Sequence, residues 1–322
     1  LIQETLMPNL LENLGLTLNR FRSNMLRLRS SLLDMELPGR IGQLLCQLIE
    51  RDDVEPDEEY ESDFKTFMEE LLDNWNKKDY LSVLCLVLFG LKENQLAMNA
   101  SEYADIEGHG KDTEFMLFVK TLILEESALI ESRSNRQYLR QAIQNAERLV
   151  ELNPNSARYY HLLGRCMAQD SKISKDFNDN VGKAIKLFEQ GRKLTQLETE
   201  FEKYEHLLYF IFSNNLAFCY LLLYEREPKE QYLEKCDDNL GVLSKLPQAH
   251  WPPNFFDTQA KRLIIEARMV LDSKTRRRLL KKARDLITYL PATECKYYVP
   301  RWLSKSISDR LGEIDELLGG LE

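Results

Sequence analysis

The most constraining feature of this sequence is a proline in the middle of the chain with a helical pattern on each side. The pattern before Pro154 contains two small residues, Ala142 and Ala146, four positions apart, and the pattern after it contains Gly164. Small residues let helices approach closely, and Pro154 ends the first helix because proline cannot continue it. The two patterns are Ala142-x3-Ala146-x2-Leu149 and Tyr160-x2-Leu163-Gly164-x2-Met167. A two-helix unit cannot bury its own apolar face, so the sequence predicts stacked neighbours and an all-α solenoid.

The same pattern recurs downstream. Ala217 and Ala260 stand where Gly164 does, in Ser213-x2-Leu216-Ala217-x2-Tyr220 and Phe256-x2-Gln259-Ala260-x2-Leu263, and the second-helix pattern recurs as Ala184-x3-Phe188-x2-Gly191 and Leu279-x3-Ala283-x2-Leu286-x4-Pro291. These residues resemble the tetratricopeptide repeat (TPR) family, which stacks helix–turn–helix units of about 34 residues. The resemblance covers roughly residues 113–295 and implies a right-handed solenoid. Its small residues lie farther apart than in the family, which predicts longer helix ends or loops at 171–180, 195–204 and 250–253.

Composition divides the chain into four predicted parts. Residues 1–51 form an N-terminal helical segment, and residues 52–63 form an acidic linker and domain boundary. A TPR-like solenoid then covers 64–295, and a capping helix that shields the last repeat covers 296–322. The leucine-rich face of the first part leaves two alternatives open: self-association, or folding back onto the solenoid.

Periodicity also predicts the helices that precede the clear repeats. We expect a hairpin of residues 64–75 and 80–96, a polar loop at 104–113, and then helices over 115–130 and 135–152. The helix at 80–96 is apolar nearly all round, which predicts a central position.

Composition and spacing disfavour several classes of function. The net charge of −9 argues against general binding to nucleic acid or anionic membranes, although a local basic patch can override that average. The longest apolar run, 81–91, is too short to span a bilayer. The six cysteines are scattered without a C-x-x-C pair, which is typical of buried, reduced thiols. We therefore expect an intracellular protein, cytoplasmic or nuclear, without a membrane partner.

No motif predicts catalysis. The stretch from Gly108 to Thr113 only faintly resembles a phosphate-binding loop, because Asp112 stands where Ser or Thr should follow the lysine. Histidines 109, 161, 206 and 250 show no metal-ligand spacing, and no Ser/His/Asp or Cys/His arrangement can be located. We expect no enzyme activity, no metal and no cofactor.

The TPR resemblance implies a binding groove lined by the first helix of each unit. By position, the residues that face this groove are Arg158, His161, Arg165, Asn214, Asn215 and Phe218. Asn215 matches the place where many TPR proteins carry an asparagine that hydrogen-bonds a peptide backbone. Two arginines beside an amide suit an extended acidic peptide. The alternative is that these groups satisfy hydrogen bonds between repeats or face water; the two-lysine carboxylate clamp of chaperone-binding relatives is not recognisable.

A second candidate surface is the densest basic cluster, between residues 274 and 284. Its candidate residues are Lys274, Arg277, Arg278, Lys281, Lys282 and Arg284. An acidic or phosphate-bearing partner could dock there. The cluster lacks the interleaved aromatic residues of nucleic-acid readers, so a solvated outer face is the favoured interpretation.

The favoured function is a non-catalytic scaffold or adaptor that holds a protein or peptide partner, with an acidic peptide suiting the groove. Two alternatives stay open. The chain could be a sensor, regulatory subunit or segment of a larger effector assembly, which the start at Leu1 and the boundary near residue 52 suggest. It could also be a nucleic-acid-associated factor that uses the basic cluster. The partner's identity and the oligomeric state do not follow from the sequence.

Overall fold

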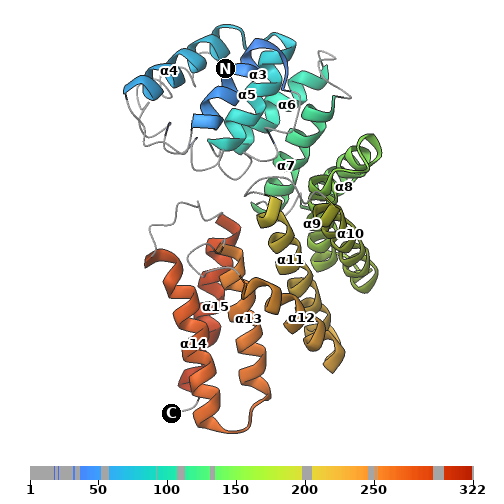
Figure 1. Cartoon of the computed structure of the whole chain (residues 1–322), viewed down its shortest axis with the longest axis vertical. Coiled ribbons are helices and arrows are strands. Elements are labelled where there is room, and N and C mark those ends of the chain that lie inside the picture. Colours follow the sequence, from blue (N-terminus) through green and yellow to red (C-terminus); the bar gives the residue numbers. More distant parts are fainter. Residues whose placement is uncertain are drawn as a thin grey trace. The chain divides into compact units, whose positions relative to one another are not determined.

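The structure, a computed structural model, consists of helices in every part of the chain that it describes. It describes residues 18, 21, 32, 37–51, 58–91, 93–106, 113–130, 135–197, 205–245, 251, 253–292 and 301–320. Within these residues thirteen α-helices and no strand are found (Figure 1). The chain forms two compact units, Leu1–Pro154 and Asn155–Glu322. This division falls at the Pro154 turn, whereas the acidic segment 52–63 was the boundary expected from composition.

The described helices of unit 1 pack in chain order around a central apolar helix. They are α3 (Gly39–Glu50), α4 (Glu58–Asp73), α5 (Lys78–Gly90), α6 (Asn94–Ile106), α7 (Glu114–Ile130) and α8 (Asn135–Leu152). Helix α5 contacts α3, α4, α6 and α7, and every residue from Leu81 to Gly90 is buried. The predicted central position of this helix is therefore confirmed.

The start of unit 1 shows how the acidic segment and the N-terminal part enter the fold. Helix α4 begins at Glu58, so residues 58–63 of the predicted linker are helical, with Tyr60 buried beneath the exposed acids. Most of the predicted helix before Pro38 lies outside the described residues. Of its described positions, Phe21 is buried and its ring lies 5.0 Å from that of Phe64.

The prediction of one helix over 80–96 and a loop from 104 was wrong. Helix α5 ends at Gly90, and a separate helix, α6, runs from Asn94 to Ile106. The buried face of α6 is built largely from Ala97, Ala100 and Ala104, which are fully buried. Small residues give a weak apolar periodicity, so the pattern did not indicate a helix there.

The described helices of unit 2 form three helical hairpins and a final helix. The helices are α9 (Ala157–Ile173), α10 (Phe177–Leu197), α11 (Glu205–Arg226), α12 (Glu230–Leu243), α13 (Pro253–Met269), α14 (Ser273–Ala292) and α15 (Arg301–Gly319). The pairs α9–α10, α11–α12 and α13–α14 are the hairpins, and α9, α11, α13 and α15 each contact the next of these four (Figure 1). We call these four helices the first-helix row. Successive packing of this kind confirms the predicted all-α solenoid.

Two glycines of unit 2 explain why its helices approach so closely. A Cβ atom on Gly164 would lie 2.5 Å from the Phe188 ring, and one on Gly191 would lie 2.3 Å from the Phe212 ring. Both rings are almost fully buried. The glycines therefore make room for the phenylalanines that fix α10 between α9 and α11.

The last helix packs as the sequence predicts for its described part. Ile314 of α15 is fully buried in a cluster with Ala260, Ala283 and Ile287 of α13 and α14. Ile307, Leu311, Leu317 and Leu318 pack against the same cluster. The side chain of Trp302, predicted on the same face, lies outside the described part.

Candidate functional site

The predicted groove residues of α9 lie on one face of that helix. Arg158, His161 and Arg165 are all half-buried. The His161 ring packs on two core rings, with its centroid 5.6 Å from that of Phe212 and 6.3 Å from that of Phe188. Burial, and secondly the charge of Arg165, lower the pKa of His161 to about 3. His161 is therefore a neutral packing residue at pH 7.

The predicted groove residues of α11 include two amide groups with unsatisfied atoms. Asn214 is 2% exposed and Asn215 is half-buried. Asn214 Oδ1 and Asn215 Nδ2 are shielded from water and have no hydrogen-bond partner within the described residues. Each unsatisfied buried group of this kind lowers the stability of the folded state by about 1–3 kcal/mol, and such groups are rare in native proteins unless they have a function.

Phe218, the remaining predicted groove residue, lies between two lysines from neighbouring helices. The Lys172 Nζ atom of α9 is 5.0 Å from the Phe218 ring centroid, and the Lys261 Nζ atom of α13 is 5.2 Å from it. These contacts are within cation–π distance. They connect α9, α11 and α13 through one aromatic ring.

The two lysines differ in how their charge is compensated. Lys261 is 4% exposed, and its Nζ atom lies 2.6 Å from Glu225 Oε2. Lys172 is exposed and has no carboxylate within ion-pair distance in the part of the chain that the structure describes. Desolvation by the surrounding helices, followed by repulsion from Lys261, lowers the pKa of Lys172. Desolvation also lowers the pKa of Lys261, against the opposing effect of Glu225.

A buried carboxylate extends this polar region to α15. Asp257 of α13 is 5% exposed, accepts a 3.1 Å hydrogen bond from Ser306 Oγ, and lies 3.4 Å from Arg310 Nε. Lys172, Lys261 and Arg310 thus share the neighbourhood of Asp257. Glu225 pairs with Lys261, and Glu313 lies 3.5 Å from Arg310 Nη1, so Lys172 is the cation of this region that has no carboxylate at ion-pair distance in the described residues.

These polar residues occupy equivalent places around the small residue of each repeat. Arg165, Phe218 and Lys261 directly follow Gly164, Ala217 and Ala260, and His161, Asn214 and Asp257 precede them by three. We call the set formed by Arg158, His161, Arg165, Lys172, Asn214, Asn215, Phe218, Asp257 and Lys261 the first-helix strip. The alignment that predicted six of its members also contained Asp257 and Lys261, so it could have identified them. Lys172 follows Arg165 by seven residues on the same helical face, which was its only signal.

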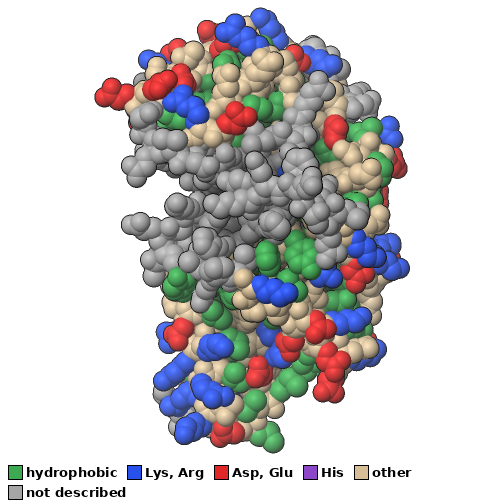
Figure 2. Space-filling model, in the orientation of Figure 1, with side chains coloured by type: hydrophobic (Ala, Val, Ile, Leu, Met, Phe, Trp, Pro, Cys, Tyr) green, Lys and Arg blue, Asp and Glu red, His purple; other side chains and the backbone are tan. Residues whose placement is uncertain are grey.

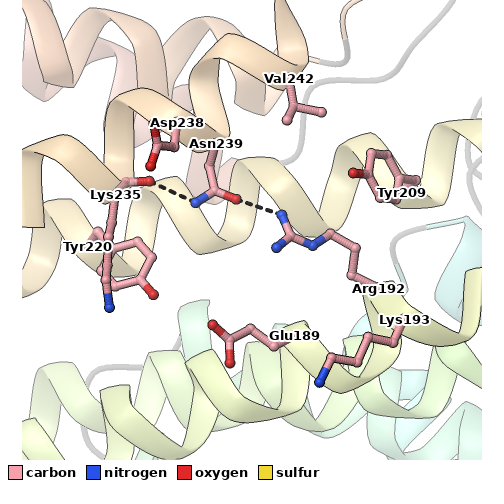
Figure 3. A pocket seen from close by; sticks show the side chains of 9 residues that line it. All are labelled: Glu189, Arg192, Lys193, Tyr209, Tyr220, Lys235, Asp238, Asn239 and Val242. Atoms are coloured by element: carbon pink, nitrogen blue, oxygen red, sulfur yellow. Dashed lines mark hydrogen bonds between the residues drawn. The ribbon is translucent and has the colours of Figure 1, made fainter. Parts of the chain in front are cut away.

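A polar hollow of about 590 Å³ lies elsewhere in unit 2, among α10, α11 and α12 (Figure 3). Arg192 donates a 2.8 Å hydrogen bond to Asn239 Oδ1, and Asn239 donates a 2.7 Å bond to the Lys235 carbonyl. Glu189 and Lys193 lie beside Arg192 on α10, on the opposite side of the hollow from Lys235 and Asn239 of α12 (Figure 3). Since acids and bases alternate around it and Arg192 and Asn239 bind each other, the hollow favours no class of ligand.

The basic cluster of α14 is exposed to solvent. All six predicted residues are exposed, and Figure 2 shows Lys and Arg side chains gathered on the α14 side of unit 2. Arg284 is paired with Asp315 of α15 at 3.4 Å. The other five predicted residues and Asp285 surround a shallow hollow of about 410 Å³.

Other groups that could carry chemistry do not assemble in the described residues. No group of three or more His, Cys, Asp or Glu side chains there could hold a metal ion. Burial raises the pKa of Cys85, Cys219 and Cys236 to about 12, so these thiols stay protonated. Within the described part, no helix has the length and apolar character needed to cross a membrane.

Comparison with known proteins does not assign the chain to a family. No family model, no curated protein and no solved structure matches the chain.

Proposed function

We propose that the first-helix strip binds an extended acidic segment of a partner protein, so that the chain acts as a non-catalytic scaffold or adaptor. The observation that carries the proposal is the Phe218 ring with a lysine on either neighbouring helix, one of which, Lys172, lacks a carboxylate partner in the described residues. This surface offers charge and an aromatic face together, and it runs across three helices.

Electrostatics favours an anionic ligand at this place. Lys172 is partly desolvated and repelled by Lys261, which is why its pKa is lowered. A ligand carboxylate about 4 Å from Lys172 would gain from about 1 kcal/mol of Coulomb energy in water to about 4 kcal/mol at an effective dielectric constant near 20. Because Lys172 is exposed, solvent screening holds the gain well below the upper figure. That carboxylate would also screen the repulsion between the two lysines.

The amides beside Phe218 favour a peptide over a simple anion. Asn214 Oδ1 needs a donor and Asn215 Nδ2 needs an acceptor. An extended peptide backbone supplies an N–H and a C=O at every residue. Because both atoms are shielded from water, the two side chains must rotate to meet the backbone, so binding would involve a small local rearrangement.

A random peptide library tests the proposal while the partner is still unidentified. Wild-type protein should enrich peptides rich in Asp and Glu, and Lys172→Glu should lose them. Lys175→Glu is a matched control, because Lys175 is an exposed lysine just beyond α9. Synthetic copies of the enriched peptides should bind Lys172→Ala at least about tenfold more weakly than wild type, a difference of about 1.4 kcal/mol.

Two results would contradict the proposal. One is enrichment of peptides without an acidic bias. The other is an equal loss of binding in the Lys172 and Lys175 variants, which would place the effect in overall charge instead of the first-helix strip.

A further inference from the structure

The helix α14 has a basic face that packing within unit 2 does not use. Its apolar residues Leu279, Leu280, Ala283 and Ile287 are buried in the core. The opposite face carries Lys274, Arg277, Arg278, Lys281 and Lys282, all exposed. We call these five residues the basic face; it covers about 12 Å of helix, since each residue rises about 1.5 Å.

Neighbouring groups compensate only part of the basic face: Arg277 has an interaction of its own, and the charge of Arg278 acts on Asp272. Lys274, Arg278, Lys281 and Lys282 form no ion pair with any residue that the structure describes. Asp272 accepts a 2.8 Å hydrogen bond from the Thr275 N–H and so caps the helix.

Two nearby arginines bind other groups of unit 2 and therefore do not belong to the basic face. Arg276 donates to the carbonyls of Ala267 and Val270 at the end of α13, and Arg284 pairs with Asp315. Among the described residues that line the hollow at the basic face, Asp285 is the one acid.

An apolar side chain is exposed at the start of the same helix. Leu271, in the turn between α13 and α14, is 94% exposed, and Met269 is 56% exposed. Side chains on a helix lean toward its N-terminus, so Lys274, Arg277 and Arg278 extend toward this turn. Cations and an exposed leucine therefore gather at one end of α14.

We propose that this end of α14 docks on a negatively charged membrane surface, with Leu271 entering the headgroup region. Each Lys or Arg near an anionic leaflet strengthens binding by about fivefold, and clusters of four to eight such residues on an amphipathic helix are typical of acidic-lipid binding. A leucine beside them supplies the second, apolar signal that stable peripheral binding needs. The net charge of −9 belongs to the chain as a whole and does not describe this face.

A nucleic-acid backbone would account for the cations but not for Leu271. The basic face has no aromatic residue to stack on bases and no Asn or Gln to read them. Nucleic acid would therefore bind through phosphates alone and would be indifferent to a change at Leu271. Leu271 thus distinguishes the two ligands.

Vesicle sedimentation of the full chain tests the proposal. We expect binding to phosphatidylcholine vesicles that contain about one third phosphatidylserine and none to pure phosphatidylcholine. The double change Arg278→Ala/Lys281→Ala should weaken binding about 25-fold, from two cations at about fivefold each. Leu271→Asp should weaken it at least about tenfold.

The control variant removes two exposed lysines from α10 and the α9–α10 turn. Lys175→Ala/Lys186→Ala changes the net charge equally and should keep at least half of the wild-type vesicle binding. Circular dichroism of every variant checks that the fold is retained; none of the four residues removed is buried.

Three outcomes would overturn the proposal. They are absence of binding to the anionic vesicles at low salt, vesicle binding unchanged by Leu271→Asp, and equal losses in the α14 and control variants. Duplex DNA added in parallel identifies the main competitor: if DNA binds, vesicles do not, and Leu271→Asp leaves DNA binding intact, the face is a phosphate-backbone site.

Discussion

Helices α5 and α11 lie in the middle of their respective units, yet their surfaces differ. Helix α5 contacts four other helices and buries every residue from Leu81 to Gly90, none of which is charged. Helix α11 also contacts several helices, but it presents Asn214, Asn215 and Phe218 along the first-helix strip. A central helix can therefore be buried in the core on all sides, as α5 is, or carry a polar strip beside its core-facing residues, as α11 does.

The difference between α5 and α11 supports the proposal that unit 2 binds a partner through its first helices. In α5 all surfaces are committed to packing, so polar groups would be costly there. Helix α11 carries two amides with unsatisfied atoms and the Phe218 ring between two lysines, although such groups lower the stability of the folded state. Retained cost of this kind is a feature of functional sites.

The largest expected effect comes from introducing a carboxylate into each helix. Val87→Asp places an unpaired charge at a fully buried position of α5 and should destabilise unit 1 by about 4 kcal/mol or more. Phe218→Glu places its charge beside Lys172 and Lys261 and should cost less than half as much. Urea unfolding of both variants measures the two losses of stability; equal losses would show that α11 tolerates a charge at Phe218 no better than α5 does at Val87.

The next effect concerns how closely α11 approaches α10. Gly191→Ala would bring a Cβ atom 2.3 Å from Phe212 and 3.0 Å from the Tyr160 Cβ, and should cost about 1–3 kcal/mol. Gly182→Ala, on the same helix, meets no atom within 4 Å and should stabilise the protein by up to about 1 kcal/mol. Thermal unfolding of the two variants gives the sign of each change, and a gain in both would mean that helix propensity, and not the space around Gly191, decides the outcome.

The sequence predicted the features that depend on spacing. Gly164, Ala217 and Ala260 could be aligned because close helix packing restricts those positions to small residues. That alignment gave the all-α solenoid and placed Asn214, Asn215 and Phe218 on one strip.

What escaped prediction depends on partners distant in the chain. Helix α6 was missed because it buries mainly alanines. Lys172 meets Phe218 only through the packing of α9 on α11, which no local pattern encodes. The desolvation of both lysines likewise arises from tertiary packing.

A smaller effect separates the satisfied and unsatisfied amides of unit 2. Asn239 is 9% exposed and both donates and accepts a hydrogen bond, so Asn239→Ala should cost about 1–3 kcal/mol. Asn215→Ala removes an unsatisfied buried donor and should be neutral or stabilising by about 1 kcal/mol. Chemical denaturation measures both. A loss at Asn215 as large as that at Asn239 would show that its amide has a structural partner and would remove it from the first-helix strip.

The last prediction is a pH dependence that belongs to the first-helix strip and not to α5. Burial holds the pKa of His161 at about 3, below its ordinary value of 6.5, so the unfolded chain takes up a proton at a higher pH than the folded chain. The neutral ring thus contributes stability that is complete above pH 6.5 and is lost as the pH falls from 6.5 toward 3. His161→Leu removes this dependence while keeping an apolar contact with Phe188 and Phe212. The difference in melting temperature between wild type and His161→Leu should therefore shift against the wild type between about pH 7 and about pH 5. A difference that stays constant over this range would mean that the folded state accommodates the protonated ring, and that α9 is more open to water at this position than its packing on the two phenylalanines implies.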